Sequence, residues 1–291
     1  MQSRGDEIMT TFRRILRRKS ALLSLIFITL ITVAAIIAPL ISPFNPNEQF
    51  KDGLTLQGAP IAPGGNYLFG TDLLGRDLLS RLIYGARTSL TVGIIANGVA
   101  VIVGTAVGII AGYLKGRVGA LMMRFTDLMM AFPALLLAIT LAAIFSPSLL
   151  IVALVIAMVN WVQIARVVYS QAVSISEREF VTATRGLGAT NSRVLTKHIL
   201  PHLLPTVLVY ATLGIATTVL LEATLSFLGI GVRPPTPSWG NIIFENQTYF
   251  ITAPWLVFIP GTLIILLALS FNLLGDALRD ELDPTQRGLS S

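Results

Sequence analysis

The chain has 291 residues, of which 54% are hydrophobic and only 12% are charged. The charged share is about half that of an ordinary soluble protein, and the mean hydropathy of +0.76 indicates a membrane protein instead. Cysteine is absent, which excludes disulfides, thiolate metal sites and a cysteine nucleophile. The net charge is +6, and it suggests a partner only once the side of the bilayer on which the basic residues lie is known.

The sequence predicts an all-α membrane protein with six transmembrane helices. A basic N-terminus, 1–20, precedes a first apolar run, 21–41, which is longer than the core of a cleaved signal peptide and therefore indicates an anchor helix. A polar segment, 42–87, follows, and then a transmembrane core, 88–274, and a polar tail, 275–291. The apolar runs of the core are 88–113, 121–144, 148–169, 203–230 and 254–274.

The second run carries small residues four positions apart: Ala96, Ala100, Gly104, Gly108 and Gly112. Such a stripe makes one helix face nearly flat, so a neighbouring helix can approach closely. We expect it to be a packing face, either within the bundle or across a subunit interface.

The distribution of Lys and Arg sets the orientation. With the N-terminus in the cytoplasm, 16 of the 21 Lys and Arg residues fall in cytoplasmic segments or at nearby helix ends. Six spans return the C-terminus to the cytoplasm, make 42–87 extracytoplasmic and place the loop 170–201 on the inner side. The excess of basic residues therefore indicates the orientation in the membrane, and we do not expect nucleic-acid binding.

The loop 170–201 is long for a connection between two spans. Its part 177–201 reads EREFVTATRGLGATNSRVLTKHILP. We expect a helix up to Leu187, a turn at Gly188, a second helix capped by Asn191 and Ser192, and a break at Pro201 where the fifth span starts. Exposed apolar side chains on these helices favour docking of a soluble partner, and the alternative is a loop lying on lipid headgroups.

The stretch FVTATRGLGAT and the closing Ile199-Leu200-Pro201 resemble the EAA loop of permease subunits of ABC importers. In that family the loop contacts the ATPase subunit. Thr182, Ala183 and Thr184 fill the E-A-A positions, so Thr182 replaces the glutamate, and Glu179 lies one turn before it. The resemblance assigns ATPase coupling to Glu179, Phe180, Thr182, Ala183, Thr184, Gly188, Ala189, Ile199 and Pro201.

Longer stretches at 69–90, 221–240 and 275–284 resemble the C-type permeases of dipeptide, oligopeptide and nickel importers. The resemblance implies the transmembrane domain of a type I, methionine-permease-like importer in the inner membrane of a prokaryote. It implies a homologous B-type permease, two cytoplasmic ATPase subunits that bind ATP and Mg, and an extracytoplasmic substrate-binding protein. The expected cargo is a di- or oligopeptide, and nickel or glutathione-like solutes are the alternatives.

Ionisable and amide side chains within spans suggest function. Asn97, Asn160 and Glu222 are candidates either for the pathway or for interhelical hydrogen bonds, and Arg124 and Asp127 are spaced to pair on one helix face.

The sequence offers no recognisable catalytic apparatus. It contains no GxxxxGK[ST] loop, so we assign no ATP hydrolysis to this chain and no catalytic residues. His198 and His202 alone make a poor metal site, and we expect no bound metal or cofactor. An ion-driven secondary transporter is the alternative from another class, but the inverted repeats that it predicts are not evident.

Overall fold

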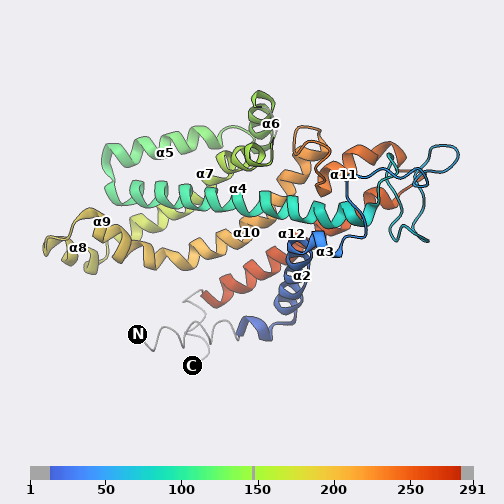
Figure 1. Cartoon of the computed structure of the whole chain (residues 1–291). Helices are drawn as coiled ribbons and strands as arrows, with labels where there is room; N and C mark the ends of the chain where they lie inside the picture. The colour runs from blue at the N-terminus through green and yellow to red at the C-terminus, as the bar shows by residue number, and fades with distance from the viewer. Residues whose placement is uncertain (1–13, 146–147, 283–291) are drawn as a thin grey trace.

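The computed structural model describes residues 14–145 and 148–282, which form helices joined by short turns and one long polar segment. The outer parts of the predicted termini, 1–13 and 283–291, lie outside the described residues. The helices, seen in Figure 1, are α2 (Lys19–Ile36), α3 (Ala38–Ile41), α4 (Leu78–Leu114), α5 (Gly116–Met130), α6 (Ala134–Ile144), α7 (Leu149–Ser176), α8 (Glu179–Gly186), α9 (Asn191–Val194), a π-helix (Leu195–Ile199), α10 (Leu200–Phe227), α11 (Trp239–Asn246), a 3₁₀ turn (Gln247–Tyr249) and α12 (Trp255–Leu282).

The predicted all-α membrane fold is confirmed, with one change to the third span. Among the described residues, five helices are long and apolar enough to cross a membrane, and a bent pair, α5 and α6, supplies a sixth crossing if it counts as one. The predicted span 121–144 is thus not a single helix, because α5 and α6 meet at an angle of 87°. Pro133 lies at this break, and proline both lacks the N–H that would continue α5 and disfavours helical geometry in the residue before it.

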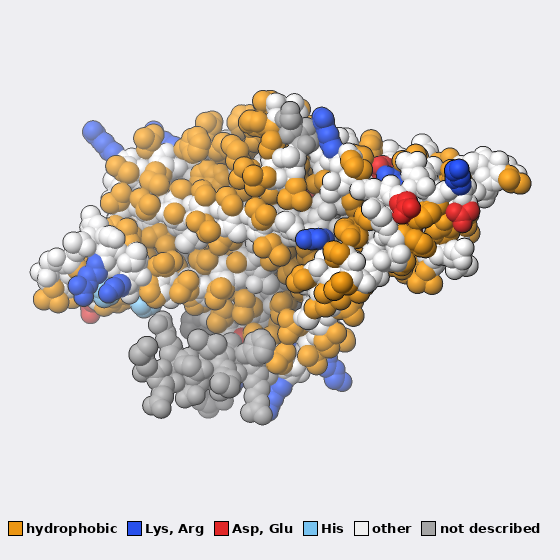
Figure 2. All heavy atoms as spheres, viewed as in Figure 1, with side chains coloured by type: hydrophobic (Ala, Val, Ile, Leu, Met, Phe, Trp, Pro, Cys, Tyr) orange, Lys and Arg blue, Asp and Glu red, His pale blue; other side chains and the backbone are white. Residues whose placement is uncertain are grey.

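The central pair of the bundle is α4 and α7, and α10 packs against both. On the other side of α10 lies α12, and α2 packs against α12 and α4. Figure 1 shows α8 and α9 at one end of the bundle and α11 at the opposite end. On the face seen in Figure 2, hydrophobic side chains cover the middle while most charged side chains gather toward the two ends, as expected of a protein surrounded by lipid.

The small-residue stripe of α4 lies against α7 of the same chain. A Cβ atom on Gly104 would lie 2.6 Å from the Trp161 carbonyl oxygen, and one on Gly108 would lie 2.6 Å from the Ala165 carbonyl oxygen. Such distances leave no room for a side chain, so the two backbones touch only because these positions are glycine. Ala100 and Gly112, also of the stripe, are buried too.

The helix α4 begins at Leu78 rather than at residue 88. Asp77 caps it, because its carboxylate accepts hydrogen bonds from the Ser80 backbone N–H at 2.7 Å and from the Ser80 hydroxyl at 2.6 Å. The extra turns are less apolar than the span itself, so a search for apolar runs alone misses them.

Candidate functional site

The coupling element is the segment 177–201, which leaves α7 at Ser176 and returns to the bundle through α10. At its start, the Lys115 ammonium lies 2.7 Å from the Glu177 carboxylate and ties the element to the turn between α4 and α5. Both side chains are exposed, so this ion pair orients the chain more than it stabilises it.

Gly188 forms the turn between the two helical parts of the element. Its φ of +78° lies in the left-handed region that favours glycine. Its N–H donates to the Arg185 carbonyl at 2.9 Å, which closes the end of α8. The helix α9 is capped by Thr190, whose hydroxyl accepts from the Arg193 N–H at 3.4 Å, and not by Asn191 and Ser192 as predicted.

One face of the element is buried against its own chain. Val181, Val194 and Ile199 are completely buried beside Tyr113 of α4. The Tyr113 hydroxyl donates to Asn191 Oδ1 at 2.8 Å, and the Arg185 guanidinium lies 4.2 Å above the Tyr113 ring. The expectation that Val194 and Ile199 are exposed for docking is thus wrong, since these side chains hold the element to the bundle instead.

The opposite face of the element is open. Leu187 is 89% exposed, and Glu179, Thr182 and Ala183 are also exposed, as is Gly188. Of the other predicted coupling residues, four are only half-buried: Phe180, Thr184, Ala189 and Pro201. The Thr184 hydroxyl donates to the Phe180 carbonyl at 2.7 Å within α8. The exposed surface of the element therefore centres on the C-terminal half of α8 and the Gly188 turn.

The predicted break at Pro201 does not occur. Helical structure continues from Asn191 to Phe227, and the π-helix 195–199 absorbs the irregularity. Pro201 directly follows this π-helix, at the second position of α10, and π segments often mark functional positions. His202 Nδ1 lies 2.7 Å from the His198 carbonyl oxygen, and its ring stacks on Phe180 of α8 with the centroids 5.1 Å apart.

The two asparagine candidates within the spans both join helices of this chain. Asn97 Nδ2 donates to the Ala211 carbonyl at 2.5 Å and connects α4 to α10. Asn160 Nδ2 donates to the Thr218 hydroxyl at 3.3 Å and connects α7 to α10.

Glu222 lies at the centre of a buried polar cluster near the C-terminal end of α10. Its carboxylate accepts from the Ser89 hydroxyl of α4 at 2.9 Å and from the Ser226 hydroxyl at 2.7 Å. Ser89 also accepts from the Trp239 backbone N–H at 3.4 Å, which brings in α11. The Glu222 side chain has no exposed surface within this chain, so the structure places it in contacts among three helices.

Asp127 pairs with a different partner from the one predicted. Its carboxylate forms an ion pair with Arg166 of α7, and not with Arg124 of its own helix. The packing of α5 against α7 brings Arg166 within reach, which spacing along one helix cannot reveal.

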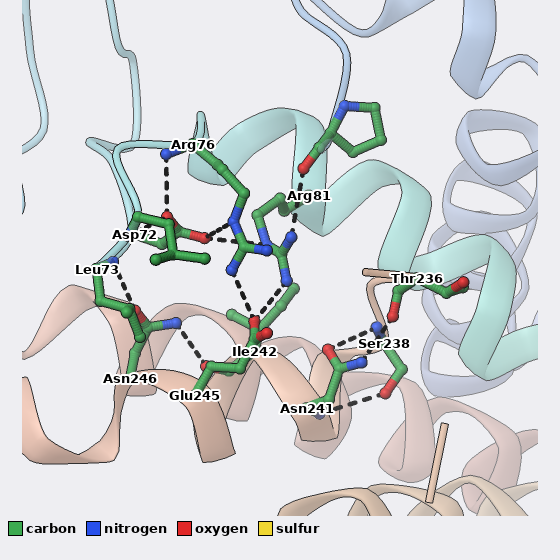
Figure 3. A network of polar contacts seen from close by, with 12 residues as sticks. Asp72, Leu73, Arg76, Arg81, Thr236, Ser238, Asn241, Ile242, Glu245 and Asn246 are labelled. Carbon is green, nitrogen blue, oxygen red and sulfur yellow. Dashed lines mark hydrogen bonds and ion pairs between the residues drawn. The ribbon is translucent and has the colours of Figure 1, made fainter. Parts of the chain in front are cut away.

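A second buried cluster lies at the end of the bundle opposite the coupling element, and the sequence analysis did not predict it (Figure 3). Asp72 Oδ2 lies 2.6 Å from Arg76 Nε and 3.3 Å from Arg81 Nε. Glu245 Oε2 of α11 accepts from Arg76 Nη2 at 2.9 Å and from Arg81 Nη2 at 2.6 Å. Leu73 N–H adds a hydrogen bond of 3.0 Å to the Asn246 side chain. The two carboxylates and two guanidiniums together lock the polar segment to the start of α4 and to α11.

An aromatic cluster completes the segment 42–77. Phe44, Phe50 and Tyr67 pack with ring centroids 4.9 to 5.8 Å apart. The Tyr67 hydroxyl donates to Asp52 Oδ1 at 3.1 Å. Burial, together with this hydrogen bond and the nearby carboxylates, raises the pKa of Tyr67 to about 12, so the phenol stays protonated at neutral pH.

Comparison with known proteins identifies the family. Residues 104–288 match the family described as the binding-protein-dependent transport system inner membrane component, and residues 9–58 match the N-terminal transmembrane domain of oligopeptide transport permease C. The chain belongs to this transport family. The first match covers the segment that contains the coupling element and α10 with Glu222.

Curated relatives of this inner membrane component are permeases of peptide transport systems. This chain is 42% identical to the dipeptide transport system permease protein DppC of Alkalihalophilus pseudofirmus, over 95% of this chain and 89% of that protein. It is 42% identical to the di/tripeptide permease DppC of Pseudomonas aeruginosa, over 91% of this chain and 88% of that protein. The oligopeptide permease OppC of Escherichia coli is 38% identical, over 94% and 90% of the respective chains.

A solved structure shares the fold. A chain of the MetNI methionine ABC transporter, in an inward-facing conformation, superposes with a TM-score of 0.59 at 18% identity. The match covers 71% of this chain and 98% of that chain. The predicted likeness to a methionine-permease-like transmembrane domain is therefore confirmed at the level of fold.

Proposed function

We propose that this inner membrane component is the C-type permease subunit of an ATP-driven importer of di- or oligopeptides. The observation that carries the proposal is the form of the coupling element: one face buried in its own bundle, the other open to a partner, and a helix that continues into α10. The peptide names of the relatives support the cargo over nickel or glutathione-like solutes. An ion-driven secondary transporter is not favoured by the family match.

The assembly that we propose has a homologous B-type permease beside this chain, two ATPase subunits on the inner side and a substrate-binding protein on the outer side. ATP and Mg bind to the ATPase subunits, since this sequence has no phosphate-binding loop. Both termini and the coupling element face the cytoplasm. The domain limits follow this topology, with the anchor 21–41, the outer segment 42–87 and the core 88–274.

The mechanism that we propose is alternating access. Closure of the ATPase subunits displaces α8 through the open surface around Leu187 and Gly188. The buried contacts of Val181 and Val194 transmit this displacement to the bundle, because a loosely held loop transmits no preference between two states.

The experiment that tests the proposal is reconstitution in proteoliposomes with and without each proposed partner. We expect uptake of a radiolabelled dipeptide only when both permeases, the ATPases, the binding protein and ATP are present. Uptake by this chain alone, without ATP, would overturn the proposal. Crosslinking from a cysteine introduced at Leu187 tests the docking surface independently: we expect an adduct with an ATPase subunit, and labelling by lipid alone contradicts it.

A further inference from the structure

A cavity of about 760 Å³ opens beside the coupling element, between α7, α10 and α12. Its volume falls in the range of small-molecule sites. The polar residues at its wall include Arg178, Arg279, His202 and Gln171. The apolar residues include Val167, Val209 and Leu213, which lie further along the same helices.

The two ionised side chains that line the cavity in the described part of the chain, Arg178 and Arg279, are both positive. No carboxylate lines it among the residues that the structure describes. The acidic residues next to Arg279 point elsewhere, because Asp280 lies 2.5 Å from Arg18 and Glu281 lies 3.9 Å from Arg14. The two guanidiniums of Arg178 and Arg279 are therefore left to attract an anion from the same opening.

The hydrogen-bonding groups are arranged in advance for such an anion. The Thr206 hydroxyl donates to Gln171 Oε1 at 2.9 Å, which fixes the amide and leaves its N–H₂ group available as a donor. Guanidinium groups bind phosphate oxygens through paired N–H donors. The polar groups of the cavity lie near the helix ends, and its apolar residues lie further along the membrane-spanning helices. A phospholipid has the same arrangement, with its headgroup at the membrane surface and its acyl chains in the hydrocarbon core.

We propose that this cavity binds the phosphate headgroup of an anionic phospholipid of the inner leaflet, with an acyl chain along the apolar wall. Basic pockets between transmembrane helices on the cytoplasmic side bind such headgroups. Arg178 directly precedes α8, and His202 stacks on Phe180 of α8. A bound lipid therefore joins the end of α12 to the coupling element and stabilises its position. The inner-side placement rests on the proposed function, whereas the lipid contact itself does not.

The test is native mass spectrometry of the full chain, extracted with its partners from membranes and exchanged into nanodiscs of phosphatidylcholine with or without phosphatidylglycerol. We expect one phosphatidylglycerol to remain bound to the wild-type chain after delipidation. We expect its occupancy to fall at least fivefold in Arg178→Gln/Arg279→Gln. The control Arg117→Gln/Arg124→Gln removes the same charge from exposed positions of α5, away from the cavity, and should retain the lipid.

Three results would overturn the proposal. Equal lipid loss in the two double variants would show a diffuse charge effect. Displacement of the bound species by inorganic phosphate, with the same dependence on Arg178 and Arg279, would assign the cavity to a soluble anion. Displacement by a dipeptide would assign it to the transport pathway. Failure of ATP-driven uptake would leave the lipid measurement unaffected, so the two proposals fail separately.

Discussion

The buried ionic cluster at the outer end gives a quantitative prediction for Glu245→Gln. In the wild type the charges of two guanidiniums and two carboxylates cancel. The substitution leaves the two positive charges of Arg76 and Arg81 with the single negative charge of Asp72. Arg81 is completely buried and Arg76 is only 3% exposed, so water does not replace the lost charge. Removing one partner from a buried ion pair costs about 3–5 kcal/mol, and we expect unfolding of the chain to become easier by that amount.

A second substitution separates charge balance from the loss of a contact. In Arg76→Met/Glu245→Gln one carboxylate, Asp72, again faces one guanidinium, Arg81. We expect the double variant to recover on the order of 2 kcal/mol relative to the sum of the single variants.

The assay is thermal unfolding in detergent followed by tryptophan fluorescence. Trp239 is completely buried at the start of α11, and its indole N–H donates to the Leu82 carbonyl at 3.0 Å, so its emission reports detachment of α11 from α4. Glu48→Gln, an exposed position of the same outer segment, is the control and should leave the midpoint unchanged. Additive effects of the Arg76 and Glu245 substitutions would refute the argument from charge balance.

Three further predictions concern glycine positions and Glu222. Gly108→Ala should destabilise the chain by about 1–3 kcal/mol in the same assay, because its Cβ meets the backbone of α7, whereas Gly98→Ala meets open space and should be neutral. Gly188→Ala should leave membrane insertion intact but lower uptake per ATP hydrolysed, because an L-residue in the left-handed region costs about 1–2 kcal/mol. The control is Gly186→Ala, a position that is equally open but helical. It should retain the wild-type ratio of uptake to hydrolysis when transport and ATPase activity are measured together. Glu222→Leu should lower the unfolding midpoint more than Glu222→Gln, because only Leu removes the oxygen that accepts from the buried Ser89 and Ser226 hydroxyls, and equal midpoints would contradict this.

The sequence was sufficient to predict the spans that form single helices, because length and apolarity alone decide them. The sequence was not sufficient to predict whether a proline interrupts a helix. Pro133 separates α5 from α6, whereas Pro201 leaves the helix intact. The apolar residues on both sides of Pro133 conceal the break there, and nothing in the local sequence shows that the π-helix 195–199 keeps the helix continuous up to Pro201.

Among the site residues, those whose role depends on sequence neighbours could be predicted, and those whose contacts come from distant segments could not. Gly188 is recognisable from its neighbours, since a glycine between two helical stretches signals a left-handed turn. The partner of Asp127 is not recognisable, because Arg166 comes from another helix. The cluster around Asp72 offered one local signal, an Asp and an Arg four residues apart in a sequence poor in charge, but Glu245 joins it from a distant segment.

The continuity of the helix 191–227 explains how the two ends of the molecule are connected. At 1.5 Å per residue its 37 residues extend about 55 Å, from the coupling element to the Glu222 cluster. Its inner end is held by Val194 and Ile199, and its outer end is held by Ser89 through Glu222. In the proposed mechanism a displacement of α8 would therefore reach the Glu222 cluster along one element, unless it is absorbed in the π-helix or at Pro205, where the regular hydrogen bonding is interrupted. These two interruptions lie close to the N-terminal end of the helix, so in the proposed mechanism we expect the part of α10 beyond them to move as a rigid body with α4 and α11.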